Sequence, residues 1–347
     1  MPEREEDRYQ RCLDQAKQAS SGGRFEEALA WVSEALRANP DGAEARNERG
    51  ELLWEQCQPE EALRDFTYAC EVAPDYYTAH LNRLELLIEE FNDSEEALEL
   101  ADELLSGSLE RDVESEVYYL KAKALFYLED LEGALFLLRR ALQVQGELPV
   151  YRAFEGQILF EMGRMAEARH SLERARGMEP DAPHTLYHLA LITEHEGNHM
   201  RAEQLFEQAE RGQPDLYPRP VRIEPAEFQA TAEQAVRALP ESIQTYVQNC
   251  PIIIEDLPGP SLIREYQIPP TLLGLFLGTP VTEPGYSPTM GTGLRIAPDK
   301  ILLFKRNLEK VATSRADLIE QIQITVKHEL AHYLGLDEDE VERLGLA

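Results

Sequence analysis

The stretch that decides how this chain is interpreted lies near its C-terminal end and reads His328-Glu329-Leu330-Ala331-His332-Tyr333-Leu334-Gly335-Leu336-Asp337-Glu338. On a helix, residues four apart share a face, so His328 and His332 can bring two imidazole nitrogens to one metal ion. Glu329 then lies beside the open coordination position. This HExxH arrangement predicts a zinc site on a helix.

The third zinc ligand is expected just beyond this helix. Gly335 can end the helix in a left-handed turn, after which an acidic side chain two or three residues later can return to the metal. Glu338 and Asp337 both meet that condition, and Glu342, further along the chain, is a third candidate.

A period of about 34 residues runs through the first part of the chain. Alanines recur at Ala28, Ala62, Ala97, Ala134, Ala168 and Ala202. A second small residue lies twelve positions before five of them, at Ala16, Gly50, Ala122, Gly156 and Ala190, whereas the third unit has Glu85 there. Prolines close four units, at Pro40, Pro74, Pro180 and Pro214. The pattern resembles the tetratricopeptide repeat, in which two antiparallel helices cross closely at small residues. Six such repeats are expected over residues 7–214.

The resemblance implies a solenoid whose concave face is lined by the first helix of each repeat and holds a peptide or a partner protein. Four residues fall at a first-helix position that tends to face this groove: Asn47, Asn82, Tyr119 and Tyr187. An asparagine there can hydrogen-bond to a peptide backbone. Ordinary solvated or packing roles are the alternative, and we favour it for these four residues.

A second literal HExxH sequence occurs at residues 195–199, inside the sixth repeat. Gly197 and Asn198 lie between its two histidines and predict a turn between the helices of that repeat. His195 and His199 are therefore not expected on one continuous helix, and we do not interpret this copy as a zinc site.

The chain of 347 residues has 34 basic and 65 acidic residues, a net charge of -31, and most of the acidic excess precedes residue 222. Such a surface repels phosphate backbones and anionic membranes, so neither nucleic acid nor a membrane is expected as a partner. The first residues are charged, and no apolar run approaches a membrane span. A cytoplasmic location is the default expectation.

Four prolines between residues 214 and 225 predict a domain boundary, because neither a helix nor a central strand tolerates that density. We therefore expect a solenoid over residues 1–213, a Pro-rich linker over 214–223 and a second domain over 224–347. In the second domain the sequence predicts helices from Pro225 and from Pro240, a strand over 251–256, a short strand or turn over 272–278, one or two further strands over 294–296 and 300–306, and a long helix over 315–334. The fold class is mainly α, a repeat solenoid followed by a small α+β domain.

The second domain resembles the minimal zincin-like bacterial metallopeptidases. The likeness rests on the order of its elements, on Leu-Leu-Gly-Leu-Phe-Leu-Gly at 272–278, on Ile-Leu-Leu-Phe-Lys-Arg at 301–306, and on the HExxHxxG motif. It implies that His328 and His332 bind zinc, that Glu329 is the general base and that Glu338 occupies the position of the third ligand. The family motif has aspartate at that position, which leaves Asp337 as the competing ligand.

Together these features predict a zinc-dependent peptidase that acts on a peptide or protein substrate and whose solenoid recruits substrate or a partner. Zinc lowers the pKa of a bound water toward ~7, and Glu329 can take its proton. The strand expected at 300–306 is the predicted site of pairing with an extended substrate. The alternative is an interaction scaffold whose zincin-like domain binds metal but is catalytically weak or inactive.

Overall fold

The computed structural model describes residues 4–239, 244, 250–278 and 299–336. The chain divides into two compact units, Met1–Tyr151 and Arg152–Ala347. The domain boundaries expected from the sequence stay a prediction. No helix in the described part of the chain is both long and apolar enough to cross a bilayer.

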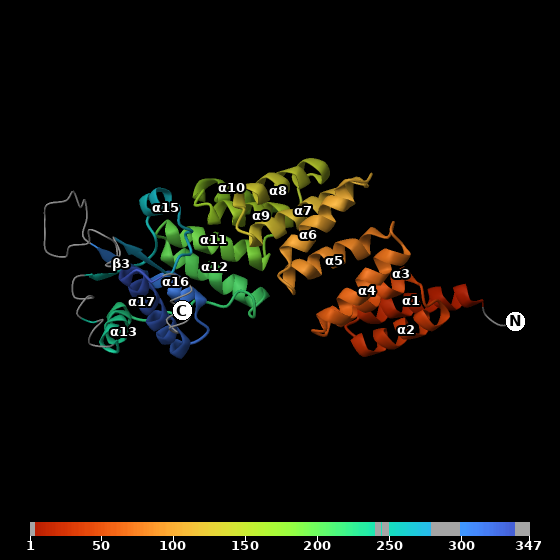
Figure 1. Cartoon of the computed structure of the whole chain (residues 1–347), viewed down its shortest axis with the longest axis horizontal. Helices are drawn as coiled ribbons and strands as arrows, with labels where there is room; N and C mark the ends of the chain where they lie inside the picture. The colour runs from red at the N-terminus through yellow and green to blue at the C-terminus, as the bar shows by residue number, and fades with distance from the viewer. Residues whose placement is uncertain (1–3, 240–243, 245–249, 279–298, 337–347) are drawn as a thin grey trace. The chain divides into compact units, whose positions relative to one another are not determined.

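The described part of the chain contains the six expected helix pairs, which follow one another from α1 to α12 (Figure 1). Their bounds are α1 Glu5–Ser21, α2 Phe25–Ala38, α3 Ala43–Glu55, α4 Pro59–Val72, α5 Tyr77–Glu89, α6 Ser94–Leu105, α7 Arg111–Tyr127, α8 Leu131–Gln145, α9 Pro149–Glu161, α10 Met165–Met178, α11 Pro183–His195 and α12 His199–Gly212. The mainly α fold class is thereby confirmed.

Small residues occupy the places where the paired helices cross. All six periodic alanines, from Ala28 to Ala202, are buried. A Cβ added at Gly50 would lie 2.5 Å from Cε1 of Phe66, and one added at Gly156 would lie 2.4 Å from Cγ of Leu172. The period in the sequence therefore reflects close approach of helices, which larger side chains would prevent.

The C-terminal part of the second unit combines four helices with a small sheet in the described residues (Figure 1). Its elements are α13 Pro225–Arg237, β1 Ile252–Glu255, α15 Pro260–Tyr266, β2 Gly274–Leu277, β3 Lys300–Phe304, α16 Lys305–Val311 and α17 Arg315–Leu334. The long helix α17 packs against β2, β3, α13 and α16. Its apolar stripe, Leu318, Ile322, Val326 and Leu330, lies in the core of this domain.

Among the described residues the sheet has the strand order β1-β3-β2, with β1 parallel and β2 antiparallel to β3. Ile301, Leu302, Leu303 and Phe304 are all buried, as expected of a strand covered on both faces. The prediction that strand 300–306 offers an edge to the substrate is wrong, because β1 and β2 occupy both of its edges. The strand also ends earlier than expected, at Phe304, and α16 begins at Lys305.

The helices that start at Pro225 and near Arg315 and the strands at 252–255 and 274–277 agree with the sequence-based predictions. Two other predicted elements, the helix from Pro240 and the strand at 294–296, lie outside the described residues. The sequence did not predict the two short helices α15 and α16.

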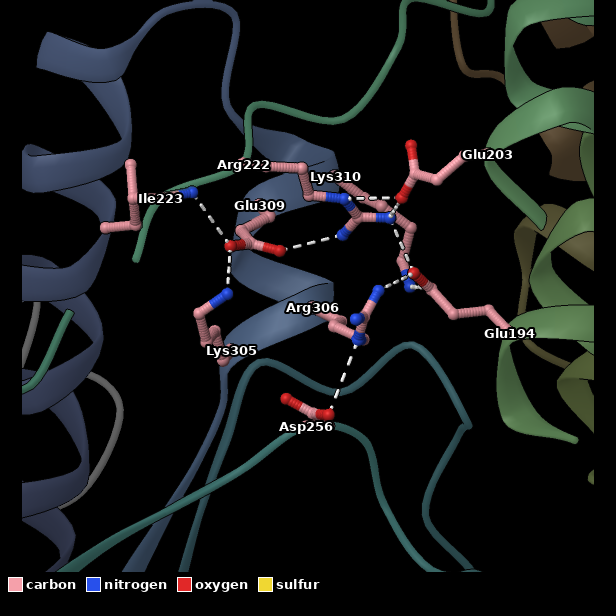
Figure 2. Close-up of polar contacts among 9 residues, drawn as sticks. All are labelled: Glu194, Glu203, Arg222, Ile223, Asp256, Lys305, Arg306, Glu309 and Lys310. Atoms are coloured by element: carbon pink, nitrogen blue, oxygen red, sulfur yellow. Dashed lines mark hydrogen bonds and ion pairs between the residues drawn. The ribbon is translucent and has the colours of Figure 1, made fainter. Parts of the chain in front are cut away.

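The end of the Pro-rich segment is bound to α16. The backbone N–H groups of Val221 and Ile223 donate to the carbonyl and the carboxylate of Glu309, at 2.8 Å and 3.1 Å. Between them, the Arg222 guanidinium contacts Glu194 of α11 at 2.6 Å and both Glu203 of α12 and Glu309 at 2.7 Å (Figure 2).

Glu194 is the centre of this group of charges. Besides Arg222, it accepts from Arg306 at 2.9 Å and Lys310 at 2.6 Å, and its side chain is 0% exposed. Lys305 pairs with Glu309 on the far side (Figure 2). We refer to Glu194, Glu203, Arg222, Lys305, Arg306, Glu309 and Lys310 as the junction cluster. It joins the sixth repeat to the C-terminal domain.

Candidate metal centre

Helix α17 carries the predicted zinc motif and is capped at both ends. At its start the Ser314 hydroxyl accepts from the backbone N–H of Asp317 at 3.1 Å. At its end Gly335 has φ 78° and donates to the His332 carbonyl, while Leu336 donates to the Ala331 carbonyl. These two bonds form a Schellman motif, for which a left-handed glycine is favoured. The helix therefore ends at Leu334, two residues after the second histidine, as the sequence predicted.

The two motif histidines face one another on one side of α17. Their Nε2 atoms are 3.0 Å apart, and their ring planes lie at 85° with centroids 4.6 Å apart. Two nitrogens bound to one tetrahedral zinc ion at the usual bond lengths lie about 3.3 Å apart. The arrangement of His328 and His332 therefore fits a shared metal ion.

Glu329 is 7% exposed and lies against strand β2. A Cβ added at Gly274 would be 2.8 Å from Cγ and Oε1 of Glu329 and 2.8 Å from Cγ2 of Thr325. The absence of a side chain at Gly274 thus provides the space that the Glu329 carboxylate occupies. The sequence analysis did not identify this role, although a glycine inside an apolar strand marks close approach of another group.

A cavity of about 650 Å³ opens beside these residues. Its walls come from α17 and its cap and from β2 with its flanking residues, and they consist of Leu272, Gly274, Leu275, Phe276, Gly278, His328, Glu329, His332, Gly335 and Leu336. The histidine pair and Glu329 lie together on a mostly apolar pocket, as expected of a small-molecule or peptide site.

The predicted third ligands, Glu338 and Asp337, lie outside the described residues, as does Glu342. Within the described ranges, which end at Leu336, no group of three His, Cys, Asp or Glu side chains forms a metal-binding set. The third ligand therefore stays a prediction.

The structure separates the histidines of the second HExxH sequence. His195 is the last residue of α11 and His199 the first of α12, with Gly197 at φ 81° between them. Burial is the largest cause of the low pKa of His195, about 4, and an interaction with the Pro270 backbone partly opposes it. Its ring also lies edge-on to Phe160, with centroids 5.8 Å apart. His195 thus packs against the C-terminal domain.

The predicted groove residues Asn47 and Asn82 occupy corresponding positions on α3 and α5. Nδ2 of Asn82 donates to Oδ1 of Asn47 at 3.0 Å and to Oε1 of Glu51 at 2.7 Å. Asn47 also donates to Glu51 at 2.7 Å and is 3% exposed. These contacts connect the first helices of two neighbouring repeats.

The two predicted groove tyrosines are half-buried in ring contacts. Tyr119 stacks on Tyr151 with centroids 4.9 Å apart, and burial raises its pKa to about 12. In the second unit Tyr187 packs against Phe206 and Tyr217 at 5.4 Å and 5.3 Å. Both tyrosines have packing roles, and binding of a partner by these residues stays a prediction.

The comparisons with known proteins agree with this architecture. A family model described as zincin-like metallopeptidase matches residues 247–346. Tetratricopeptide-repeat models match residues 13–63, 115–147 and 155–217. No curated protein matches the chain.

Several solved structures share the repeat fold. The type IV pilus biogenesis factor PilW is 18% identical, with a TM-score of 0.53 over 60% of this chain and 94% of its own. PilF of Pseudomonas aeruginosa is 16% identical, with a TM-score of 0.52 over 65% of this chain and 98% of its own. A tetratricopeptide repeat protein from Parabacteroides merdae is 17% identical, with a TM-score of 0.51 over 58% of this chain and 78% of its own. At such identities the likeness is one of fold. The chain therefore combines tetratricopeptide repeats with a C-terminal zincin-like metallopeptidase domain.

Proposed function

We propose that this protein is a zinc-dependent peptidase whose repeats recruit the substrate or a partner protein. The observation that carries the proposal is the pair of Nε2 atoms 3.0 Å apart, next to Glu329, on a cavity of about 650 Å³. His328 and His332 would hold the metal ion, together with Glu338 or Asp337. When bound, zinc supplies a water of lowered pKa and polarises the carbonyl of the scissile bond.

Glu329 is the proposed general base. Its carboxylate would take a proton from the attacking water and pass it to the amine that leaves. The carboxylate packs closely against Gly274, in the wall of the cavity. That packing restricts the positions that the carboxylate can adopt, which keeps it beside the histidine pair.

Strand β2 is the proposed binding edge for an extended substrate. It pairs with β3 along one side, and no described residue pairs with its other side. Gly274, Leu275 and Phe276 of this strand line the cavity. A peptide that adds to the edge of β2 would therefore lie along the wall of the site that faces Glu329, with its backbone bound by main-chain hydrogen bonds.

Replacing Glu329 by glutamine tests the peptidase proposal. We expect cleavage of fluorescently labelled casein to fall by about 10²- to 10⁴-fold, because the amide cannot accept the proton. Zinc content, measured by elemental analysis, should stay at the wild-type level. Glu320→Gln, on an exposed part of the same helix, is the matched control and should retain activity.

Zinc bound to a wild-type protein that does not cleave casein would contradict the peptidase proposal. That result would favour the alternative, an interaction scaffold with a metal-binding but inactive zincin-like domain. Equal activity of wild type and Glu329→Gln would contradict the role of Glu329.

The third ligand can be identified by metal content alone. We expect Glu338→Ala to lose most of its zinc, because two histidines and a water hold zinc more weakly than three protein ligands. Asp337→Ala should retain it. Zinc loss from Asp337→Ala with retention in Glu338→Ala would reverse the assignment.

The solenoid supplies the proposed partner site. Next to Asn47 and Asn82, a hollow of about 530 Å³ is lined by Trp54 and by the glutamates Glu51, Glu55, Glu85 and Glu90. The paired amides and this acidic hollow together favour an extended segment that carries lysine or arginine. Weaker binding of a partner to Asn82→Ala than to wild type would support this assignment.

A further inference from the structure

The loop 269–273 leads directly into β2 and contributes Leu272 to the cavity wall. Its carbonyl groups are bound by the C-terminal domain itself. Nδ2 of Asn307 donates to the carbonyls of Pro270 and Leu272 at 2.8 Å and 2.7 Å, and the Phe304 N–H donates to Leu273 at 2.9 Å. The position of this loop therefore sets where the edge strand begins.

The fifth and sixth repeats bind the same loop from the other side. Oε2 of Glu161, the last residue of α9, accepts from the Thr271 hydroxyl at 3.2 Å. The His195 ring, at the end of α11, interacts with the Pro270 backbone. The C-terminal ends of two consecutive first helices thus meet one loop of the C-terminal domain.

Two further features show that this contact is close. Gly163 follows α9 with φ 69°, and a Cβ added there would lie 2.6 Å from Cγ2 of Ile263 in α15. Burial raises the pKa of Glu161 to about 7, against the opposing effect of the Thr271 hydroxyl. The carboxyl group therefore lies half-buried between the repeat and the loop.

The junction cluster fixes the neighbouring elements. Glu194 binds Arg306 and Lys310 of α16, and α16 begins directly after the last residue of β3 (Figure 2). Because β2 pairs with β3, β2 is held at its start by the loop 269–273 and along its length by β3. The repeats contact both the loop and the helix α16 that follows β3.

We propose that the fifth and sixth repeats are part of the peptidase site, with Glu161 and His195 as positioning residues for the edge strand β2. This inference rests on the proposed function insofar as β2 binds the substrate. Neither residue lines the cavity, so both act through the loop 269–273. Loosening the loop lets β2 shift, which weakens substrate binding more than it affects proton transfer by Glu329.

The test uses the full chain with Thr271→Val and His195→Ala, each of which removes one contact between the repeats and the loop. We expect each variant to raise KM for labelled casein by roughly 3- to 10-fold, the effect of one lost hydrogen bond, with kcat within about twofold of wild type. Backbone amides of residues 274–277 should exchange with deuterium faster, while zinc content stays unchanged. Thr271→Ser and Glu161→Gln keep the bonded groups and should behave as wild type.

Glu196→Gln is the matched control, because Glu196 adjoins His195 but is exposed and pairs with Arg169 within the repeats. The proposal would be overturned if Thr271→Val and His195→Ala both left KM and the deuterium exchange of the β2 amides unchanged. An equal effect in Glu196→Gln would do the same. If the wild-type protein cleaves nothing, the proposed function fails, and the exchange of residues 274–277 still decides whether the repeats position β2.

Discussion

Replacing Gly274 by valine is expected to lower casein cleavage by about 10²-fold or more, because misplacing a catalytic group by roughly 1 Å has an effect of that size. Even a single added Cβ would lie 2.8 Å from Cγ and Oε1 of Glu329. The Glu329 side chain must then move away from β2, while the half-buried histidine pair keeps its place. Zinc content should therefore stay at the wild-type level.

Alanine at position 274 should give a smaller loss than valine, since the Glu329 side chain is flexible and can shift by a few tenths of an ångström. Gly259→Ala is the matched control in the same domain: nothing lies within 4 Å of a Cβ added there. Full turnover by Gly274→Val, in a protein whose Glu329→Gln variant is inactive, would show that the close packing of Glu329 has no catalytic importance.

Replacing Glu194 by glutamine is expected to lower the free energy of unfolding of the second unit by about 3–5 kcal/mol. The substitution removes the negative charge that Arg222, Arg306 and Lys310 share, and the Glu194 side chain is 0% exposed. Three cations would then lie close together without the negative charge that now compensates them. The shift of the urea midpoint, followed by circular dichroism, measures the effect.

Glu203→Gln is the control for this prediction, because Glu203 contacts the same arginine but its side chain is 42% exposed. An exposed ion pair contributes about 0–1 kcal/mol, so this variant should unfold nearly as wild type does. Similar losses in the two variants would contradict a special role for the buried carboxylate.

The same carboxylate should make the second unit sensitive to acid. Burial alone would raise the pKa of Glu194, but Lys310, Arg222 and Arg306 outweigh it and lower that pKa to about 2. A depressed pKa means that the ionised form stabilises the fold above the unfolded pKa of about 4.3. This contribution is lost as the pH falls from about 4 to about 2, and Glu194→Gln should lack that part of the pH dependence.

The repeats and the histidine pair could be predicted from the sequence because each depends on spacing along the chain. A small residue every 34 positions marks a helix crossing, and two histidines four apart share a helix face. The same reasoning correctly separated His195 from His199, since Gly197 interrupts the helix between them.

The arrangement of the sheet and the contacts between distant segments could not be predicted in this way. The run Ile301 to Phe304 predicts a strand, yet nothing in it says whether the strand lies at the centre or at an edge. Glu194 and Lys310 are 116 residues apart in the chain, and each resembles an ordinary surface charge. Their burial depends on the docking of α11 on α16, which local sequence patterns do not encode.

The position of Glu194 also limits how freely the C-terminal domain can be recombined with other partners. Expressed from residue 224 onward, the domain would lose Arg222, the loop contacts of α9 and α11, and the carboxylate opposite Arg306 and Lys310. A graft onto a different repeat array would have to bring an acidic side chain to the same place. The transferable unit of this protein is therefore the zincin-like domain together with its last two repeats.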